Sequence, residues 1–149
     1  MRGGYLRNLS SKENGGVPYD VKGLTLGGQS TIRGFTLGEI FPGEKELGVK
    51  PTDFKLKDSA TMYLIKSELR FPIYKAIGGA LFYDGGAVFI KNVGFDDPYR
   101  DAVGIALRYE TPVGAASLEI GYKLDRKNDD RPGQRREDAA AFHLSIGTF

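Results

Sequence analysis

The chain has 149 residues, of which 40% are hydrophobic and 27% charged, a composition that fits one ordinary domain. It has no cysteine and a single histidine, which excludes disulfides and thiolate metal sites and argues against a histidine-based zinc site. We therefore expect no cofactor and no bound metal. The net charge of +2 comes from both signs mixed along the chain, without a basic stripe, so we expect no nucleic-acid partner.

Residues 1–59 are predicted to form one long loop, because glycine, proline and charged residues interrupt every apolar run. Arg2 and Arg7 stand near the start, but no apolar run follows them, so this segment is not a secretory signal peptide. No stretch of the chain approaches the roughly 20 apolar residues of a membrane-spanning helix. That absence leaves a membrane barrel open, because its alternating strands average out as polar.

From residue 60 onward, apolar residues alternate with polar or small ones, which predicts β-strands. Five antiparallel strands are expected, at Thr61–Phe71, Ile77–Ile90, Val103–Glu110, Ala116–Leu124 and Phe142–Phe149. Most are about as long as a tilted membrane strand of roughly 9–11 residues. The alternation places Glu68 and Asp84 on the polar face, opposite the apolar side chains.

The connections between these strands alternate in length. Pro72–Ala76 and Thr111–Gly114 are short, whereas Lys91–Asp101 and Asp125–Asp138 are long, polar segments. Transmembrane barrels show this asymmetry, with short periplasmic turns and long extracellular loops. Placing Phe149 at the periplasmic end makes every long loop external.

A soluble antiparallel sandwich would have the same period of two, with the apolar face packed into a core. Two features favour a membrane barrel. Small residues and charges of both signs on the polar face suit a wet lumen; the charged ones are Glu68, Asp84, Arg108, Glu119 and Lys123. Aromatic residues near the strand ends suit an interfacial girdle; they are Tyr63, Phe71, Tyr109 and Tyr122.

The segment 26–35, Leu-Gly-Gly-Gln-Ser-Thr-Ile-Arg-Gly-Phe, resembles the signature of the Omp85 superfamily, a glycine pair followed by a (V/I)RGF tetrad in a long extracellular loop. Further segments resemble the family in the same order, so the resemblance covers nearly the whole chain from Val17 onward. These are Glu68–Pro72, Phe82–Gly86, Gly104–Gly114 and Phe142–Phe149. The fold class implied is all-β, the C-terminal five-strand portion of a transmembrane barrel, preceded by a loop that folds into the lumen.

The resemblance also implies that the arginine of the tetrad, Arg33, meets acidic residues on the lumen wall. Glu68 corresponds to the first acid and Asp84 to the second. A guanidinium offers bidentate hydrogen bonds to carboxylates, which makes such an anchor chemically sound. Gly34 would let the backbone approach the wall, and Phe35 would wedge against it. The alternative is an exposed turn, with Glu68 paired to a neighbour such as Arg108.

The last predicted strand resembles the β-signal of outer-membrane proteins, an alternating segment that ends in an aromatic residue. Its residues are Phe142, Leu144, Ile146, Gly147 and Phe149. An open strand edge carries unpaired N–H and C=O groups, so pairing along this edge is a natural mode of recognition. Gly147 would weaken or kink the seam. A simpler alternative makes Phe149 a buried terminal residue.

The function implied by the resemblance is non-enzymatic: assembly or insertion of outer-membrane proteins, with clients templated or translocated at a lateral seam. Alternatives are a two-partner-secretion channel, a passive porin or a soluble β module. The expected location is the outer membrane of a bacterium or an organelle, and the expected partners are lipid and client outer-membrane or secreted proteins. Since five strands cannot close a barrel, we also expect missing N-terminal strands in a longer chain. The resemblance further implies POTRA domains before those strands.

Overall fold

The computed structural model describes residues 2–7, 17–18, 26–40, 55–56, 59–91, 98–112, 114–126 and 138–147. It contains eight strands: β1 (Arg2–Arg7), β2 (Val17–Pro18), β3 (Lys55–Leu56), β4 (Ser59–Tyr74), β5 (Ile77–Ile90), β6 (Tyr99–Thr111), β7 (Gly114–Lys123) and β8 (Ala140–Gly147). Helix is absent from these ranges, and with it any helix that could cross a membrane.

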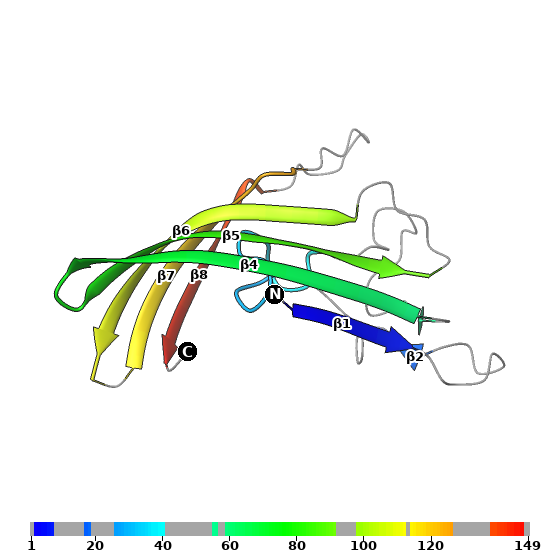
Figure 1. The fold of residues 1–149 in the computed structure, drawn as a ribbon, viewed down its shortest axis with the longest axis horizontal. Coiled ribbons are helices and arrows are strands. Elements are labelled where there is room, and N and C mark those ends of the chain that lie inside the picture. The colour runs from blue at the N-terminus through cyan, green and yellow to red at the C-terminus, as the bar shows by residue number, and fades with distance from the viewer. Residues whose placement is uncertain are drawn as a thin grey trace.

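Six of the strands form one antiparallel sheet in the order β1-β4-β5-β6-β7-β8, and β2 pairs separately with β3. The large sheet is curved, and the segment 26–40, coloured light blue, lies against it (Figure 1). β1 and β8 are its two edges, and the strand pairs of the described residues do not join them. The expectation of an all-β antiparallel sheet is therefore confirmed, and the sheet is open.

The sheet has one strand more than the alternation pattern predicted, because β1 lies inside residues 1–59, which were expected to be loop throughout. Its sequence, Arg-Gly-Gly-Tyr-Leu-Arg, has no apolar alternation that would indicate a strand. The six residues of β1 pair with Ser59–Leu64 of β4. Ladder bonds to an existing strand thus override weak local propensity. The short pair β2 and β3 also falls within this interval.

Several strand ends differ from the prediction, and two differ by three residues or more. β4 continues through Pro72 to Tyr74, with a register irregularity between those two residues. Proline is tolerated there because β1 pairs with β4 only as far as Leu64. On that side of Pro72, therefore, no described strand requires a backbone N–H donor. β6 begins at Tyr99, which shortens the expected loop before it. The alternation of short and long connections is nevertheless present, with two-residue links at 75–76 and 112–113.

The apolar face of the sheet is the exposed one. Its large side chains are between 36% and 76% exposed; they include Tyr63, Ile65, Leu69, Phe71, Leu81, Phe89, Val103, Ile105, Leu107, Tyr109, Leu118, Tyr122, Phe142, Leu144 and Ile146. The opposite face carries buried polar side chains, among them Asp84, Ser117, Glu119 and Lys123. A soluble sandwich would show the reverse arrangement. This inverted sheet is typical of a membrane barrel wall with a polar lumen.

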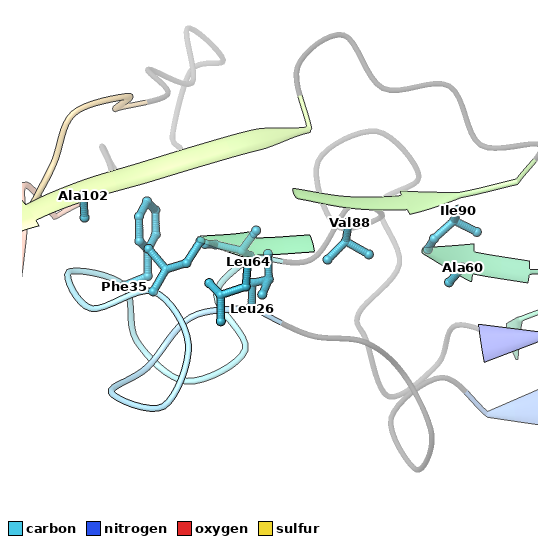
Figure 2. Packing of buried hydrophobic residues seen from close by; sticks show 9 residues of the cluster. Leu26, Phe35, Ala60, Leu64, Val88, Ile90 and Ala102 are labelled. Carbon is cyan, nitrogen blue, oxygen red and sulfur yellow. The ribbon is translucent and has the colours of Figure 1, made fainter. Parts of the chain in front are cut away.

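A small apolar core lies between the loop and the inner face. Leu26, Ile32 and Phe35 of the loop are fully buried together with Leu64 of β4 and Ala102 of β6. In Figure 2, Phe35 rises from the loop toward Ala102, while Leu26 lies close to Leu64. This packing fixes the loop against the wall, because burying each large apolar side chain contributes about 1.5–3 kcal/mol.

Candidate functional site

The segment 26–40 folds into a compact loop before it meets the sheet. A bridge between Leu26 and Ile40 closes its base, with the amide of Ile40 donating to the carbonyl of Leu26 at 3.1 Å. The amide of Gly28 donates to the carbonyl of Phe35 at 2.9 Å. Gly27 has a φ of +106°, and a Cβ there would lie 2.4 Å from the carbonyl oxygen of Thr36. The glycine therefore permits the tight crossing of the loop on itself.

Arg33 projects from this loop onto the inner face and binds two carboxylates. Its Nε and Nη2 donate to the two oxygens of Asp84 at 2.7 and 2.9 Å, and its Nη1 donates to Glu68 at 2.6 Å. The backbone amide of Arg33 also donates to Asp84, at 3.1 Å. The guanidinium lies 3.6 Å from the ring centroid of Phe82. Such a bidentate, stacked arrangement is specific to arginine, since lysine is a compact point charge.

The surroundings keep the arginine charged. Burial acts to lower the pKa of Arg33, but the hydrogen bonds that it donates to Asp84 and Glu68, together with the charges of Asp84 and Glu119, outweigh burial, and the pKa is raised above its usual range. Glu119 of β7 adds a third carboxylate, 3.7 Å from Nη1. Asp84 is completely buried, so the ion pair with Arg33 offsets the cost of burying a carboxylate.

Glu68 is shared between the loop and the wall. Besides Arg33, it binds Arg70 at 2.6 Å and Arg108 at 2.8 Å. The pair between Glu68 and Arg108, considered above as an alternative to the loop anchor, therefore exists alongside it. Arg108 also lies 3.6 Å from Glu119. Cations thus hold these acids, and the described residues contain no cluster suited to a metal ion.

Gly34 and Phe35 bring the loop backbone onto the wall. Gly34 has a φ of +99°, and a Cβ there would lie 2.9 Å from the Cβ of Ala102. Phe35 is fully buried, with its ring centroid 4.9 Å from the guanidinium of Arg100 and 4.7 Å from Nζ of Lys123. The ring therefore sits between two cations of the wall, a favourable electrostatic position for an aromatic face.

Several contacts of the loop were not predicted from the sequence. Lys123 is buried and donates to Glu39, at the end of the loop. Gly121 lies under the loop, since a Cβ there would be 2.4 Å from the amide nitrogen of Gly34. Gln29 donates to Ser145 of β8 at 2.8 Å. The alternation pattern places Gly121 and Lys123 on the inner face of their strand. Their partners in the loop are too distant along the chain to infer from the sequence.

The model of the Omp85 superfamily domain matches residues 8–149, nearly the whole chain. The chain belongs to the Omp85 superfamily. The outer membrane protein assembly factor BamA of Nitratidesulfovibrio vulgaris strain Hildenborough is 24% identical over 126 residues, which are 83% of this chain and 15% of that protein. The chain thus spans about a seventh of the length of this relative. No solved structure gives a significant match.

Membership of the Omp85 superfamily makes this an outer-membrane protein. The fold class expected from the sequence is confirmed at the level of an all-β portion of an Omp85 barrel, with six strands in the sheet. The exposed apolar face then faces lipid, and the face that carries Glu68 and Asp84, which Arg33 of the loop binds, lines the lumen.

In this Omp85 chain the predicted seam residues lie at an edge of the sheet. β8 pairs with β7 from Ala140 to Gly147, and no described strand pairs with its other side. Phe142, Leu144 and Ile146 point outward and are more than 70% exposed. Gly147 is the last residue of β8. The final predicted residue, Phe149, lies outside the described residues, and the role of the seam stays a prediction.

Proposed function

We propose that the chain is the C-terminal barrel portion of a non-catalytic factor that assembles or inserts outer-membrane proteins. The edge of β8 would pair with an incoming strand, and the loop 26–40 would hold the wall next to that edge. Among the described strands β8 is an edge strand, and an edge strand is where strand addition can occur. A relative named as an outer membrane protein assembly factor supports the same class of activity.

The observation that carries this proposal is that one loop contacts every strand from β4 to β8. Lys66 of β4 donates to the carbonyl of Gln29, and Asp84 of β5 binds Arg33. Ala102 of β6 packs in the same core as Phe35, and Lys123 of β7 binds Glu39. On β8, Ser145 accepts from Gln29, and His143 accepts from the amide of Gly34 at 3.4 Å.

A loop with this contact pattern holds five strands in one curvature, up to the edge strand. Client strands would then meet an edge of fixed geometry, because the neighbouring wall cannot flatten while the loop is seated. A passive pore needs no such coupling between a loop and its edge strand. The proposal therefore makes loop seating a condition of assembly activity.

The test is Arg33→Ala in the full-length protein that carries this chain, expressed in a strain depleted of its own copy. Removing the guanidinium leaves the buried Asp84 with Lys66, 3.8 Å away, as its remaining cation, and breaking a buried pair costs about 3–5 kcal/mol. We expect the variant to lower the amount of folded client barrels in the outer membrane. The control is Arg70→Ala, which also removes a cation from Glu68, but whose side chain is 69% exposed.

The amount of each variant in the membrane is measured alongside the clients. Normal client assembly with Arg33→Ala at normal levels would rule out a role for the anchor. Unimpaired assembly combined with loss of one secreted protein would favour the two-partner-secretion channel. The same loss with Arg70→Ala would show a general effect of charge in the lumen.

A further inference from the structure

The lipid-facing side of the sheet carries a polar cluster that the loop anchor does not use. The hydroxyl of Tyr83 on β5 donates to Asp101 on β6 at 3.1 Å and lies 2.7 Å from the hydroxyl of Tyr99. In the β5–β6 ladder, Tyr83 pairs with Val103, Gly85 with Asp101 and Ala87 with Tyr99. Because these pairs are two residues apart, Tyr83, Tyr99 and Asp101 all lie on the outward face. A carboxylate on this face is costly in a membrane unless it has a partner.

Stacked aromatic rings lie next to this polar cluster. Tyr63 stacks on Phe89 with centroids 5.9 Å apart and on Tyr99 with centroids 6.3 Å apart. Ala87 pairs with both tyrosines and is fully buried. The rings therefore form a continuous surface across β4, β5 and β6.

A glycine makes room for the cluster. A Cβ on Gly85 would lie 2.2 Å from the hydroxyl of Tyr99 and 3.2 Å from that of Tyr83. The absence of a side chain at this position allows both hydroxyls to lie over the backbone of β5. The site is thus shaped by the backbone as well as by its polar groups.

The negative charge of Asp101 is not matched by a cation within the part of the chain that the structure describes. Arg100, the adjacent residue, is buried on the inner face, where its guanidinium lies over Phe35 and 3.5 Å from Asp125. The tyrosine hydroxyls supply hydrogen bonds but no positive charge. A carboxylate near low-dielectric lipid strongly favours a cationic partner.

We propose that this cluster, Tyr63, Tyr83, Phe89, Tyr99 and Asp101, binds a membrane lipid through an ammonium group in its headgroup. The ammonium would pair with Asp101 and lie against the aromatic faces, which attract cations. Tyr99 is the first residue of β6, so the cluster lies at the long-loop end of the strands. Barrels carry their interfacial aromatic girdle at such a level, where headgroups are found. The apolar surface below it would accommodate the acyl chains.

The experiment uses the full-length protein in vesicles of a neutral lipid that contain spin-labelled phosphatidylethanolamine or spin-labelled phosphatidylglycerol. Only the first of these headgroups carries an ammonium. We expect the motionally restricted fraction of phosphatidylethanolamine to exceed that of phosphatidylglycerol by at least about two-fold, because its ammonium group contacts both the aromatic rings and the carboxylate. Asp101→Asn should bring the ratio close to one, and Asp101→Glu should preserve it.

The control is Glu110→Gln, which removes one negative charge from the opposite face of the same strand, near its short-turn end. This variant should keep the selectivity of the parent. Tyr83→Phe serves as a second variant, since it keeps the charge but removes the hydroxyl that contacts Asp101, and it should reduce the ratio partly. An unchanged ratio in a folded Asp101→Asn, or an equal loss in Glu110→Gln, would overturn the proposal. So would a protein or a second copy cross-linked at Asp101 in place of lipid.

Discussion

Arg33 faces three carboxylates, and the lumen wall also supplies cations of its own to the same acids. Arg108 reaches Glu68 and Glu119, so those two acids keep a partner without the loop. Asp84 differs, because its remaining cation, Lys66, is 3.8 Å away and its carboxylate is fully buried. Within this network the loop arginine therefore matters most to Asp84.

The contact between Gly34 and Gly121 gives a prediction at the same scale. Gly121→Ala places a methyl group 2.4 Å from the amide nitrogen and 2.6 Å from the Cα of Gly34, so the loop must lift from β7. Cysteines at Gln29 and Ser145, whose side chains touch at 2.8 Å, report loop seating by disulfide formation. We expect cross-linking to fall sharply in Gly121→Ala.

The control for that experiment is Gly78→Ala, because the nearest atom to a Cβ at Gly78 is 3.7 Å away. Cross-linking in this variant should equal that of the parent. Equal cross-linking in Gly121→Ala would show that the loop tolerates a larger gap and would contradict the close packing described above.

Among the elements, β4 and β5 form the longest hairpin, and a two-residue turn, Lys75–Ala76, joins them. Lys75 has a φ of +44°, the one non-glycine residue of the described chain with a positive value. A left-handed conformation costs a side-chain-bearing residue about 1–2 kcal/mol. Lys75 is the first residue of its two-residue turn, and hairpin turns with a positive φ at that position favour glycine there.

Lys75→Gly should therefore stabilise the barrel, by about 0.5 kcal/mol after the entropy of glycine is subtracted. The measurement is the urea midpoint of unfolding of the full-length protein from lipid vesicles. Ala76→Gly adds the same flexibility at a position without positive φ, and it should lower the midpoint. A lower midpoint for both variants would mean that Lys75 is not strained.

On the scale of the whole molecule, the sheet is inverted relative to a water-soluble one. Ile105 on β6 is 56% exposed on the outer face. Its chain neighbours, Gly104 and Ala106, belong to the inner face, where Ala106 is buried. The stability of such a wall depends on the apolar solvent around it. In water alone the same surface would drive association, because a contiguous exposed apolar patch is a site of protein–protein contact or aggregation.

Ile105→Lys should destabilise the protein in vesicles by about 2–4 kcal/mol, the cost of a cation on the lipid face near the membrane centre. Leu37→Lys is the matched control, because Leu37 lies in the loop and is 86% exposed. That variant should shift the unfolding free energy by less than about 0.5 kcal/mol. Similar shifts for both would contradict the assignment of the outward face to lipid.

The strands from β4 to β8 could be predicted because alternation is a local property. It placed Asp84, Glu119 and Lys123 on the polar face, and the structure buries all three on the inner side of the sheet. β1 could not be predicted, since it forms a strand only by pairing with β4, which is distant along the chain. The contact of Arg33 with its two acids followed from the family resemblance and not from the pattern. Lys123 and Glu39 are 84 residues apart, so no local signal could have joined them.

The pairing of β1 with β4 also bears on timing during assembly. Each other neighbouring pair of the large sheet joins consecutive strands, whereas β1 and β4 are separated by residues 8–58, which include the loop. Closing a longer connection costs more entropy, so hairpins of β4 to β8 should form first. The loop lies on the concave side of those hairpins. We therefore expect the loop to take its place while the wall is still open, so that closure of the barrel traps it.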